Sequence, residues 1–204
     1  MTRSGLVLTG VELRRGGRVL VSDLSFGLEP GQLALVTGPN GSGKTTLLRT
    51  VAGFAPPGAG EILVGGTPVA GLEPEARREI AYQGHLEGLK KDLTVYENIQ
   101  FINQLRSKSD AISKTLATLG LEPFADRSVR HLSAGQKRRT ALAALKVSGA
   151  SLWLLDEPLT NLDPAGRELV LGWIDEHLAG QGMALVATHL ADVLKRPGSL
   201  LVEL

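Results

Sequence analysis

The chain has 204 residues, a formal net charge of +1 and no cysteine. This length suits one domain, or one domain with a small inserted subdomain. The lack of cysteine excludes disulfides, thiolate metal sites and cysteine nucleophiles, and the near-neutral charge is unlike the strongly basic face of a typical nucleic-acid-binding protein.

The first part of the chain alternates predicted strands with turns. The glycine-rich loop after residue 37 lies between a short apolar run, typical of a buried parallel strand, and a helical pattern. In order, the patterns predict strands over 5–13, 19–28 and 32–37, a helix over 45–53, a hairpin over 61–69, and a segment over 74–82 that begins as a helix and ends as a strand.

The second part begins with a long helical block. The predicted elements are a helical region over 93–119, a helix over 133–148, a strand over 152–155, a helix over 164–178, a strand over 183–188 and a last edge strand over 200–204. This order predicts an α/β core, formed by residues 1–85 and 149–204 of a single domain 1–204, with a helical insert over about 86–148. The most apolar stretch, 140–155, is too short to span a membrane and contains Lys146.

Residues 38–45 fit the phosphate-binding pattern G-x-x-x-x-G-K-[ST] between a predicted strand and a predicted helix. Glycines let the backbone curl so that its N–H groups point at phosphates, and the helix start favours an anion. Lys44 is expected to contact the β- and γ-phosphates, and the Thr45 hydroxyl to reach Mg²⁺. The predicted nucleotide-binding residues here are Gly38, Pro39, Asn40, Gly41, Ser42, Gly43, Lys44, Thr45 and Thr46.

An apolar run over 152–155 ends in Asp156 and Glu157. Buried strands often end in acids, so this signal is weak alone. Next to a phosphate-binding loop it predicts that Asp156 lies near Mg²⁺ and that Glu157 orients and deprotonates the attacking water.

Residues 132–136 read LSAGQ and open a predicted helix. Ser133 could simply cap that helix, or the helix start could bind an anion. LSAGQ resembles the signature sequence LSGGQ of the ABC ATPase family. Asn161-Leu162-Asp163 resembles that family's D-loop, and Thr188-His189 resembles its switch-histidine motif.

The resemblance covers essentially the whole chain and implies a P-loop NTPase (RecA-like) core with an N-terminal antiparallel β-subdomain and an inserted α-helical subdomain. It implies ATP and Mg²⁺ as cofactors and a sandwich of two copies of the chain. Ser133, Gly135 and Gln136 would then act on the ATP of the second copy, and Asp163 would line the interface. His189 would contact the γ-phosphate.

Two positions depart from the family pattern. Arg15 occupies the place of an aromatic residue that stacks on adenine, and an arginine there can stack on the base or stay solvated. By register, His85 replaces the usual glutamine of the Q-loop, whereas Gln83 lies two residues earlier. Either side chain could approach Mg²⁺ or the attacking water, so we expect His85 in a catalytic role and Gln83 near the metal.

The sequence YQGHLEGLK at 82–90 resembles one ABC subgroup, the ATPase subunits of the haem exporter in cytochrome c maturation. The subgroup also shares basic residues at 137–139, Arg15-Gly16 and Trp153, whereas residues 159–161 read LTN in place of the more usual Phe-Thr-Ala. This resemblance implies integral membrane partners that handle haem, contacted through loop 86–91 unless that loop is only solvated. It also implies a peripheral position on the cytoplasmic face of the membrane.

We expect no direct haem binding, because covalent haem attachment needs cysteines, and no nucleic-acid partner. The alternatives are the ATPase of another ABC exporter or importer, an ABC ATPase acting on ribosomes or DNA, and a subunit that binds without hydrolysing. The single cassette and near-neutral charge disfavour the second. Intact Lys44, Asp156, Glu157 and His189 disfavour the third.

Overall fold

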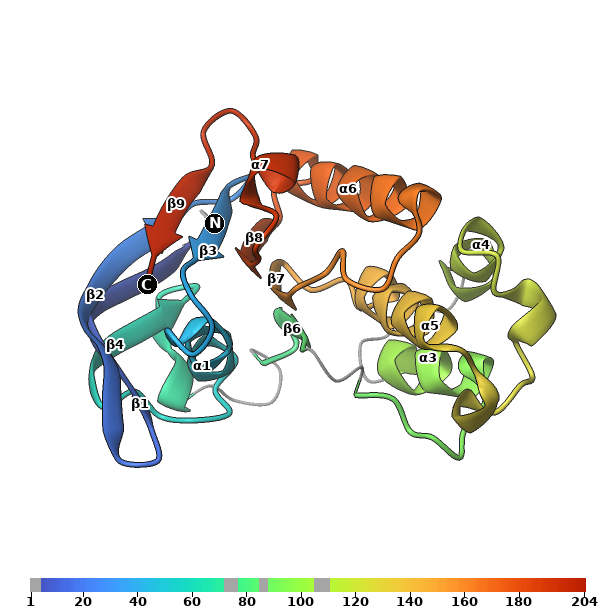
Figure 1. Ribbon diagram of the computed structural model, residues 1–204, viewed down its shortest axis with the longest axis horizontal. Coiled ribbons are helices and arrows are strands. Elements are labelled where there is room, and N and C mark those ends of the chain that lie inside the picture. Colours follow the sequence, from blue (N-terminus) through green and yellow to red (C-terminus); the bar gives the residue numbers. More distant parts are fainter. Residues whose placement is uncertain (1–4, 72–76, 85–87, 105–110) are drawn as a thin grey trace.

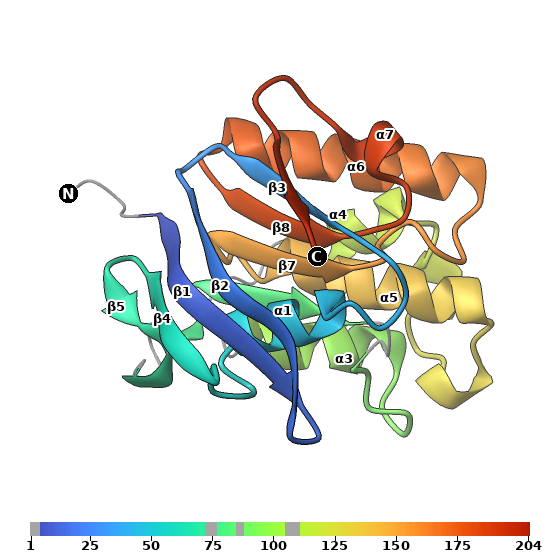
Figure 2. The same cartoon turned by 60° about the vertical axis from the view of Figure 1, so that its left-hand side comes forward.

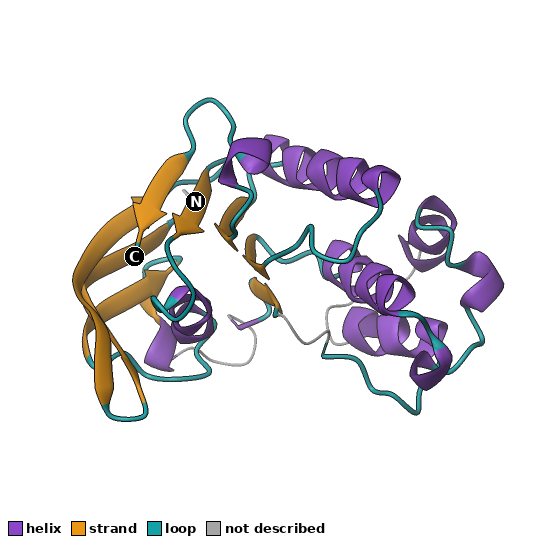
Figure 3. Ribbon diagram, viewed as in Figure 1, coloured by secondary structure: helices purple, strands orange, loops and turns teal. Residues whose placement is uncertain are grey.

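The computed structural model describes residues 5–71, 77–84, 88–104 and 111–204. It contains two sheets with helices around them (Figures 1 and 3). The first sheet is antiparallel, with the order β2-β1-β4-β5. Its strands are β1 (Leu6–Arg15), β2 (Arg18–Leu28), β4 (Ala59–Val64) and β5 (Thr67–Pro68). β1 and β2 form a hairpin whose turn contains Gly16 and Gly17 at φ of 57° and 79°, the left-handed region that glycine tolerates best.

The second sheet is parallel, with the order β6-β7-β8-β3-β9. Its strands are β3 (Leu33–Thr37), β6 (Ile80–Gln83), β7 (Leu152–Asp156), β8 (Met183–Ala187) and β9 (Leu200–Glu203). All five residues of β7 and of β8 are buried, as expected for parallel strands covered on both faces. The predicted edge position of the last strand is confirmed, because β9 stands at the end of the sheet order and, among the described strands, pairs with β3 alone.

Alternate residues of this sheet belong to two different core clusters. Ala34 and Leu154 pack in a cluster with α1 (Lys44–Val51) and the antiparallel sheet. Leu35 and Leu155 pack in the other, with α6 (Pro164–Ala179) and the helices of the insert. The parallel sheet is therefore the middle layer, as Figure 2 shows. The structure has the α/β class and the antiparallel β-subdomain that the sequence predicted.

The insert contains α3 (Val95–Gln104), α4 (Ala111–Thr118) and α5 (Ala134–Val147), which lie at the end of the molecule away from the antiparallel sheet (Figure 1). Thr94 and Glu97 hydrogen-bond reciprocally at the start of α3, the capping box that fixes a helix N-terminus. The described residues also form four short helices: η1 (Val69–Gly71), η2 (Glu122–Phe124), η3 (Val129–His131) and α7 (Ala191–Leu194).

The predicted helical region over 93–119 contains two helices, and the predicted helix start at 74–76 lies outside the described residues. The insert boundaries at 86 and 148 stay a prediction, since the apolar core of the insert continues into that of the sheet. In the part of the chain that the structure describes, no helix is long and apolar enough to cross a membrane.

Candidate functional site

The glycine-rich loop connects β3 to α1 and needs its glycines. Gly38, Gly41 and Gly43 have φ of 135°, 86° and 117°. A Cβ on Gly38 would also lie 2.3 Å from the carbonyl oxygen of Leu204. Residues with side chains would therefore strain or open the loop.

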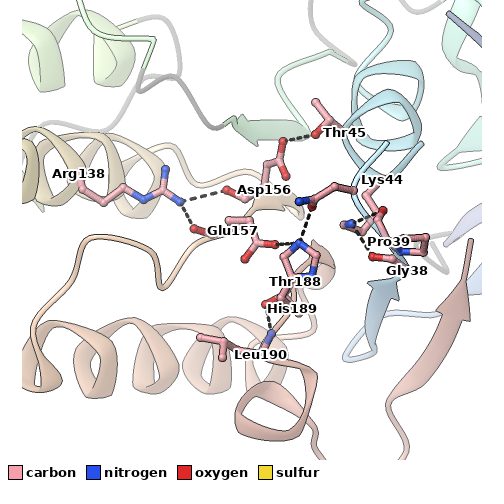
Figure 4. A network of polar contacts seen from close by, with 11 residues as sticks. Gly38, Pro39, Lys44, Thr45, Arg138, Asp156, Glu157, Thr188, His189 and Leu190 are labelled. Atoms are coloured by element: carbon pink, nitrogen blue, oxygen red, sulfur yellow. Dashed lines mark hydrogen bonds and ion pairs between the residues drawn. The ribbon is translucent and has the colours of Figure 1, made fainter. Parts of the chain in front are cut away.

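Lys44, the first residue of α1, holds the loop closed (Figure 4). Its Nζ donates to the carbonyl oxygens of Gly38 at 2.7 Å and Pro39 at 3.0 Å, and the residue is only 8% exposed. The Ser42 Oγ is buried without a hydrogen-bond partner. Buried polar groups are nearly always satisfied in folded proteins, so this hydroxyl marks the loop as a place for a polar ligand.

Asp156, at the carboxyl end of β7, faces the same loop. Its Oδ2 accepts a 2.8 Å hydrogen bond from the Thr45 hydroxyl, and the residue is 4% exposed. A hydroxyl and a carboxylate thus lie next to each other beside the phosphate-binding loop. Both are hard oxygen donors of the kind that Mg²⁺ prefers.

Glu157 follows directly in an unusual backbone conformation. Its φ is 50°, and its N–H donates to the Ala187 carbonyl at 2.9 Å. Its buried Oε1 lies 3.5 Å from His189 Nε2, which is also 3.1 Å from Asn40 Oδ1 (Figure 4). His189, which follows β8, therefore contacts both the residue after β7 and the glycine-rich loop.

These residues line one cleft of about 510 Å³. The lining residues are Arg15, Leu20, Asn40, Gly41, Gly43, Lys44, Thr45, Thr46, Asp156, Glu157, Thr160, His189 and Leu190. Arg15, the last residue of β1, is exposed at this cleft. A cleft with a buried lysine, a hydroxyl beside a carboxylate, and a second carboxylate beside a histidine can bind a phosphate chain and activate water.

The signature residues do not line the cleft of their own chain. Ser133 caps α5, because its Oγ accepts from the Gln136 N–H at 3.2 Å while the Gln136 side chain accepts from the Ser133 N–H at 2.9 Å. Gly135 lies in the first turn of the same helix. The capping role is confirmed, and action on a second copy stays a prediction.

Asp163 is the N-cap of α6 and also pairs with Arg139. Its Oδ1 accepts from the Gly166 N–H at 3.1 Å, and both carboxylate oxygens accept from Arg139 Nη2 at 2.8 Å. The Arg139 hydrogen bond is the main reason that the pKa of Asp163 is below its ordinary value. Its predicted place in a dimer interface stays a prediction.

Gln83 lies at the end of β6 but not among the residues that line the cleft. It is buried, its Nε2 donates to the Gly84 carbonyl at 3.1 Å, and it lines a separate cavity of about 230 Å³ together with Tyr82 and Asn98. Its predicted metal role stays a prediction. His85 lies outside the described residues, as do residues 86 and 87 of the loop 86–91. The predicted contact of that loop with a membrane partner stays a prediction.

Sequence reasoning missed one buried residue at this site, Arg138 on α5. Its guanidinium donates to the carbonyl oxygens of Asp156 and Glu157 (Figure 4). It also donates to the carbonyl oxygen of Gly84. The run of basic residues at 137–139 was the available signal, but a charge run on a helix is more often a solvated face.

The pattern of the ABC transporter family matches residues 21–160. The chain is 43% identical over 194 residues to the cytochrome c biogenesis ATP-binding export protein CcmA of Methylococcus capsulatus, covering 94% of each chain. It is 46% identical over 176 residues to the protein of the same name from Roseobacter denitrificans, covering 86% of this chain and 80% of the relative.

Two solved structures share the fold. An ATP-binding subunit of an ABC transporter superimposes with a TM-score of 0.87 at 23% identity, over 93% of this chain and 81% of the other. A putative ABC transporter ATP-binding protein from Pyrococcus furiosus gives a TM-score of 0.82 at 22% identity, over 98% of each chain.

Proposed function

This chain belongs to the ABC transporter family, and we propose that it is the ATP-hydrolysing subunit that powers haem export in c-type cytochrome biogenesis. One observation supports the hydrolytic part above all. Lys44 of the glycine-rich loop, the acid pair at the end of β7 and His189 after β8 meet in one cleft. The names of the relatives, cytochrome c biogenesis ATP-binding export proteins, support the cellular part.

Nucleotide binding begins at the glycine-rich loop. Lys44 Nζ, which now donates to two loop carbonyls, would turn to the β- and γ-phosphates, and the buried Ser42 hydroxyl would gain a phosphate acceptor. The start of α1 adds the partial positive charge of its unpaired N–H groups. Arg15, at the edge of the cleft, would lie against the base.

The residues beside the loop fit Mg²⁺. The Thr45 hydroxyl and the Asp156 carboxylate would hold it, and Gln83 remains a third candidate. When bound, the ion neutralises phosphate charge that develops during transfer. The 2.8 Å contact between Thr45 and Asp156 already brings the two oxygens together.

Glu157 is the proposed general base. It would accept a proton from the attacking water, whose oxygen forms a bond to the γ-phosphorus as the bond to the β-phosphate oxygen breaks, which yields ADP and phosphate. His189, 3.5 Å from the Glu157 carboxylate, would contact the γ-phosphate. His85 is a proposed further catalytic residue from the Q-loop.

The second half of each site would come from another copy of the chain. Ser133, Gly135 and Gln136 form the start of a 14-residue helix, where an anion is favoured, yet they lie outside the cleft of their own chain. A sandwich of two copies would place this helix start over the phosphates, with Asp163 at the interface.

The further partners proposed are integral membrane subunits that handle haem, with this chain bound peripherally at the cytoplasmic face. The chain itself is proposed to bind neither haem nor nucleic acid.

The test is a haem stain of covalent c-type cytochromes in cells that lack this chain, complemented with wild type or with Glu157→Gln. Loss of the stained bands, restored by wild type alone, is the expected result. Unchanged bands in the deletion strain would exclude the role in cytochrome c biogenesis and point to another exporter or an importer.

A further inference from the structure

A buried guanidinium joins the helical insert to the ends of two strands. Arg138 lies in the second turn of α5 and is 4% exposed. Its Nη1 donates to the Gly84 carbonyl after β6 at 3.1 Å. Its Nη2 donates to the carbonyls of Asp156 at 3.1 Å and Glu157 at 2.6 Å.

Arginine suits this position for two physical reasons. Three carbonyl oxygens around one point concentrate partial negative charge, which a buried cation offsets only when it is well hydrogen-bonded. The guanidinium is planar, always charged, and directs several donors along fixed directions, whereas a lysine ammonium is a compact point charge on a flexible stem. A lysine at position 138 would therefore hydrogen-bond to some of these carbonyl oxygens but not to all three.

The backbone of Glu157 is hydrogen-bonded on both sides of its side chain. The Glu157 N–H is bound to the Ala187 carbonyl of β8, and its carbonyl is bound to Arg138. Between these two anchors the residue has a φ of 50°, a conformation that residues other than glycine keep only when their surroundings enforce it. The anchors thus set the direction in which the carboxylate leaves the chain toward His189.

We infer that Arg138 is a positioning residue for ATP hydrolysis, which acts by holding the backbone of Glu157. The inference rests on the proposed role of Glu157 as general base. Arg138 does not line the nucleotide cleft, so its loss should lower kcat and leave the KM for ATP nearly unchanged. It also contacts Gly84, so it links the acid pair to the start of the Q-loop.

The experiment compares Arg138→Gln and Arg138→Lys with a matched control, Lys146→Gln. Lys146 is another cation of α5, but its Nζ pairs with Glu176 of α6 at 2.5 Å and not with the strand ends.

ATP hydrolysis by the chain is measured. The maximal rate is divided by the number of ATP-binding sites, counted with a fluorescent ATP analogue, which gives kcat per site. A misplaced catalytic group costs on the order of 100-fold, so we expect Arg138→Gln to lose about that factor in kcat per site. Arg138→Lys should lose less, and the control should match wild type.

Hydrogen exchange of the segments 80–84 and 155–160 provides a readout that does not depend on activity. Faster exchange there in Arg138→Gln, but not in Lys146→Gln, is expected. A wild-type kcat per site in Arg138→Gln would overturn the inference, even if fewer sites survive, because Arg138 would then act only on stability. Wild-type hydrolysis by Glu157→Gln would instead remove the general base, and so the proposed function on which the inference rests.

Discussion

The hydroxyl of Thr45 donates a 2.8 Å hydrogen bond to Asp156 Oδ2, across 111 positions of the sequence. Thr45 belongs to the first turn of α1, and Asp156 is the last residue of β7. The contact therefore fixes the phosphate-binding loop relative to the strand that carries both acids. Burial raises the pKa of the nearby Tyr82 phenol, and the charge of Asp156 contributes in the same direction to a smaller extent.

This pair leads to a prediction about Mg²⁺. Thr45→Val keeps the shape of the side chain but removes the oxygen, so the variant should need about 10- to 100-fold more Mg²⁺ for half-maximal ATP hydrolysis. Thr45→Ser, which keeps the hydroxyl, is the control and should resemble wild type. Titration of Mg²⁺ at fixed ATP measures the effect, and equal midpoints for Val and wild type would exclude Thr45 as a metal ligand.

Removing the proposed general base should separate binding from turnover. Glu157→Gln keeps the size of the side chain but cannot take a proton, so hydrolysis should fall by about 100-fold or more while ATP is still bound. The variant should also accumulate as a dimer when ATP is present, as measured by light scattering during gel filtration. A monomer that binds ATP would contradict the proposed sandwich.

Lys44 should matter for binding itself. Lys44→Ala removes a charged donor from the phosphates, so nucleotide affinity should fall by about 10- to 100-fold, equivalent to one or two charge-assisted hydrogen bonds. A titration with a fluorescent ATP analogue measures this loss. Lys146→Gln serves as the control for removal of a lysine charge and should bind as wild type.

Arg15 should affect binding without affecting chemistry. If it packs against the base, Arg15→Ala should raise the KM for ATP by about 10-fold and leave kcat unchanged, since it removes contacts made equally in the ground and transition states. Arg15→Tyr should restore the KM, because an aromatic ring can also stack on adenine. An unchanged KM in the Ala variant would mean that Arg15 is only solvated.

His177 leads to a prediction about stability and pH. Its ring stacks on Trp153 with centroids 4.0 Å apart, and its Nε2 lies 3.0 Å from the Met183 carbonyl. Burial lowers its pKa below 6.5, and the charge of Lys146 contributes in the same direction. The unfolded chain therefore binds this proton first as the pH falls below about 6.5, so His177 contributes stability above that pH that is lost below it.

His177→Phe keeps the stacked ring and removes the titration. The melting temperature of wild type should consequently fall more between pH 7.5 and pH 5.5 than that of His177→Phe, by about 2 °C. Thermal unfolding at both pH values measures the difference. An equal fall in the two proteins would show that His177 does not contribute to the pH dependence.

Some features of the fold and the site could be predicted from local sequence. Gly38 and Gly43 stand where the backbone needs positive φ, and the apolar run over 152–155 becomes a fully buried strand. Such features depend on neighbouring residues, so spacing and residue type reveal them. The helical region over 93–119 was predicted less well, because periodicity identifies helix type better than where one helix ends and the next begins.

The sequence by itself determined the phosphate-binding loop, the acid pair, and the order of strands and helices, because each of these depends on residues that are close together in the sequence. Only the tertiary structure decided that Thr45 meets Asp156, that Arg138 binds the carbonyls of Gly84 and Glu157, and that Asp163 pairs with Arg139. These contacts join residues that are 19 or more positions apart in the sequence, so they depend on how the layers pack. From the sequence alone, a charged side chain is expected to be exposed to solvent. Only the packed structure shows that it is buried among hydrogen-bond acceptors.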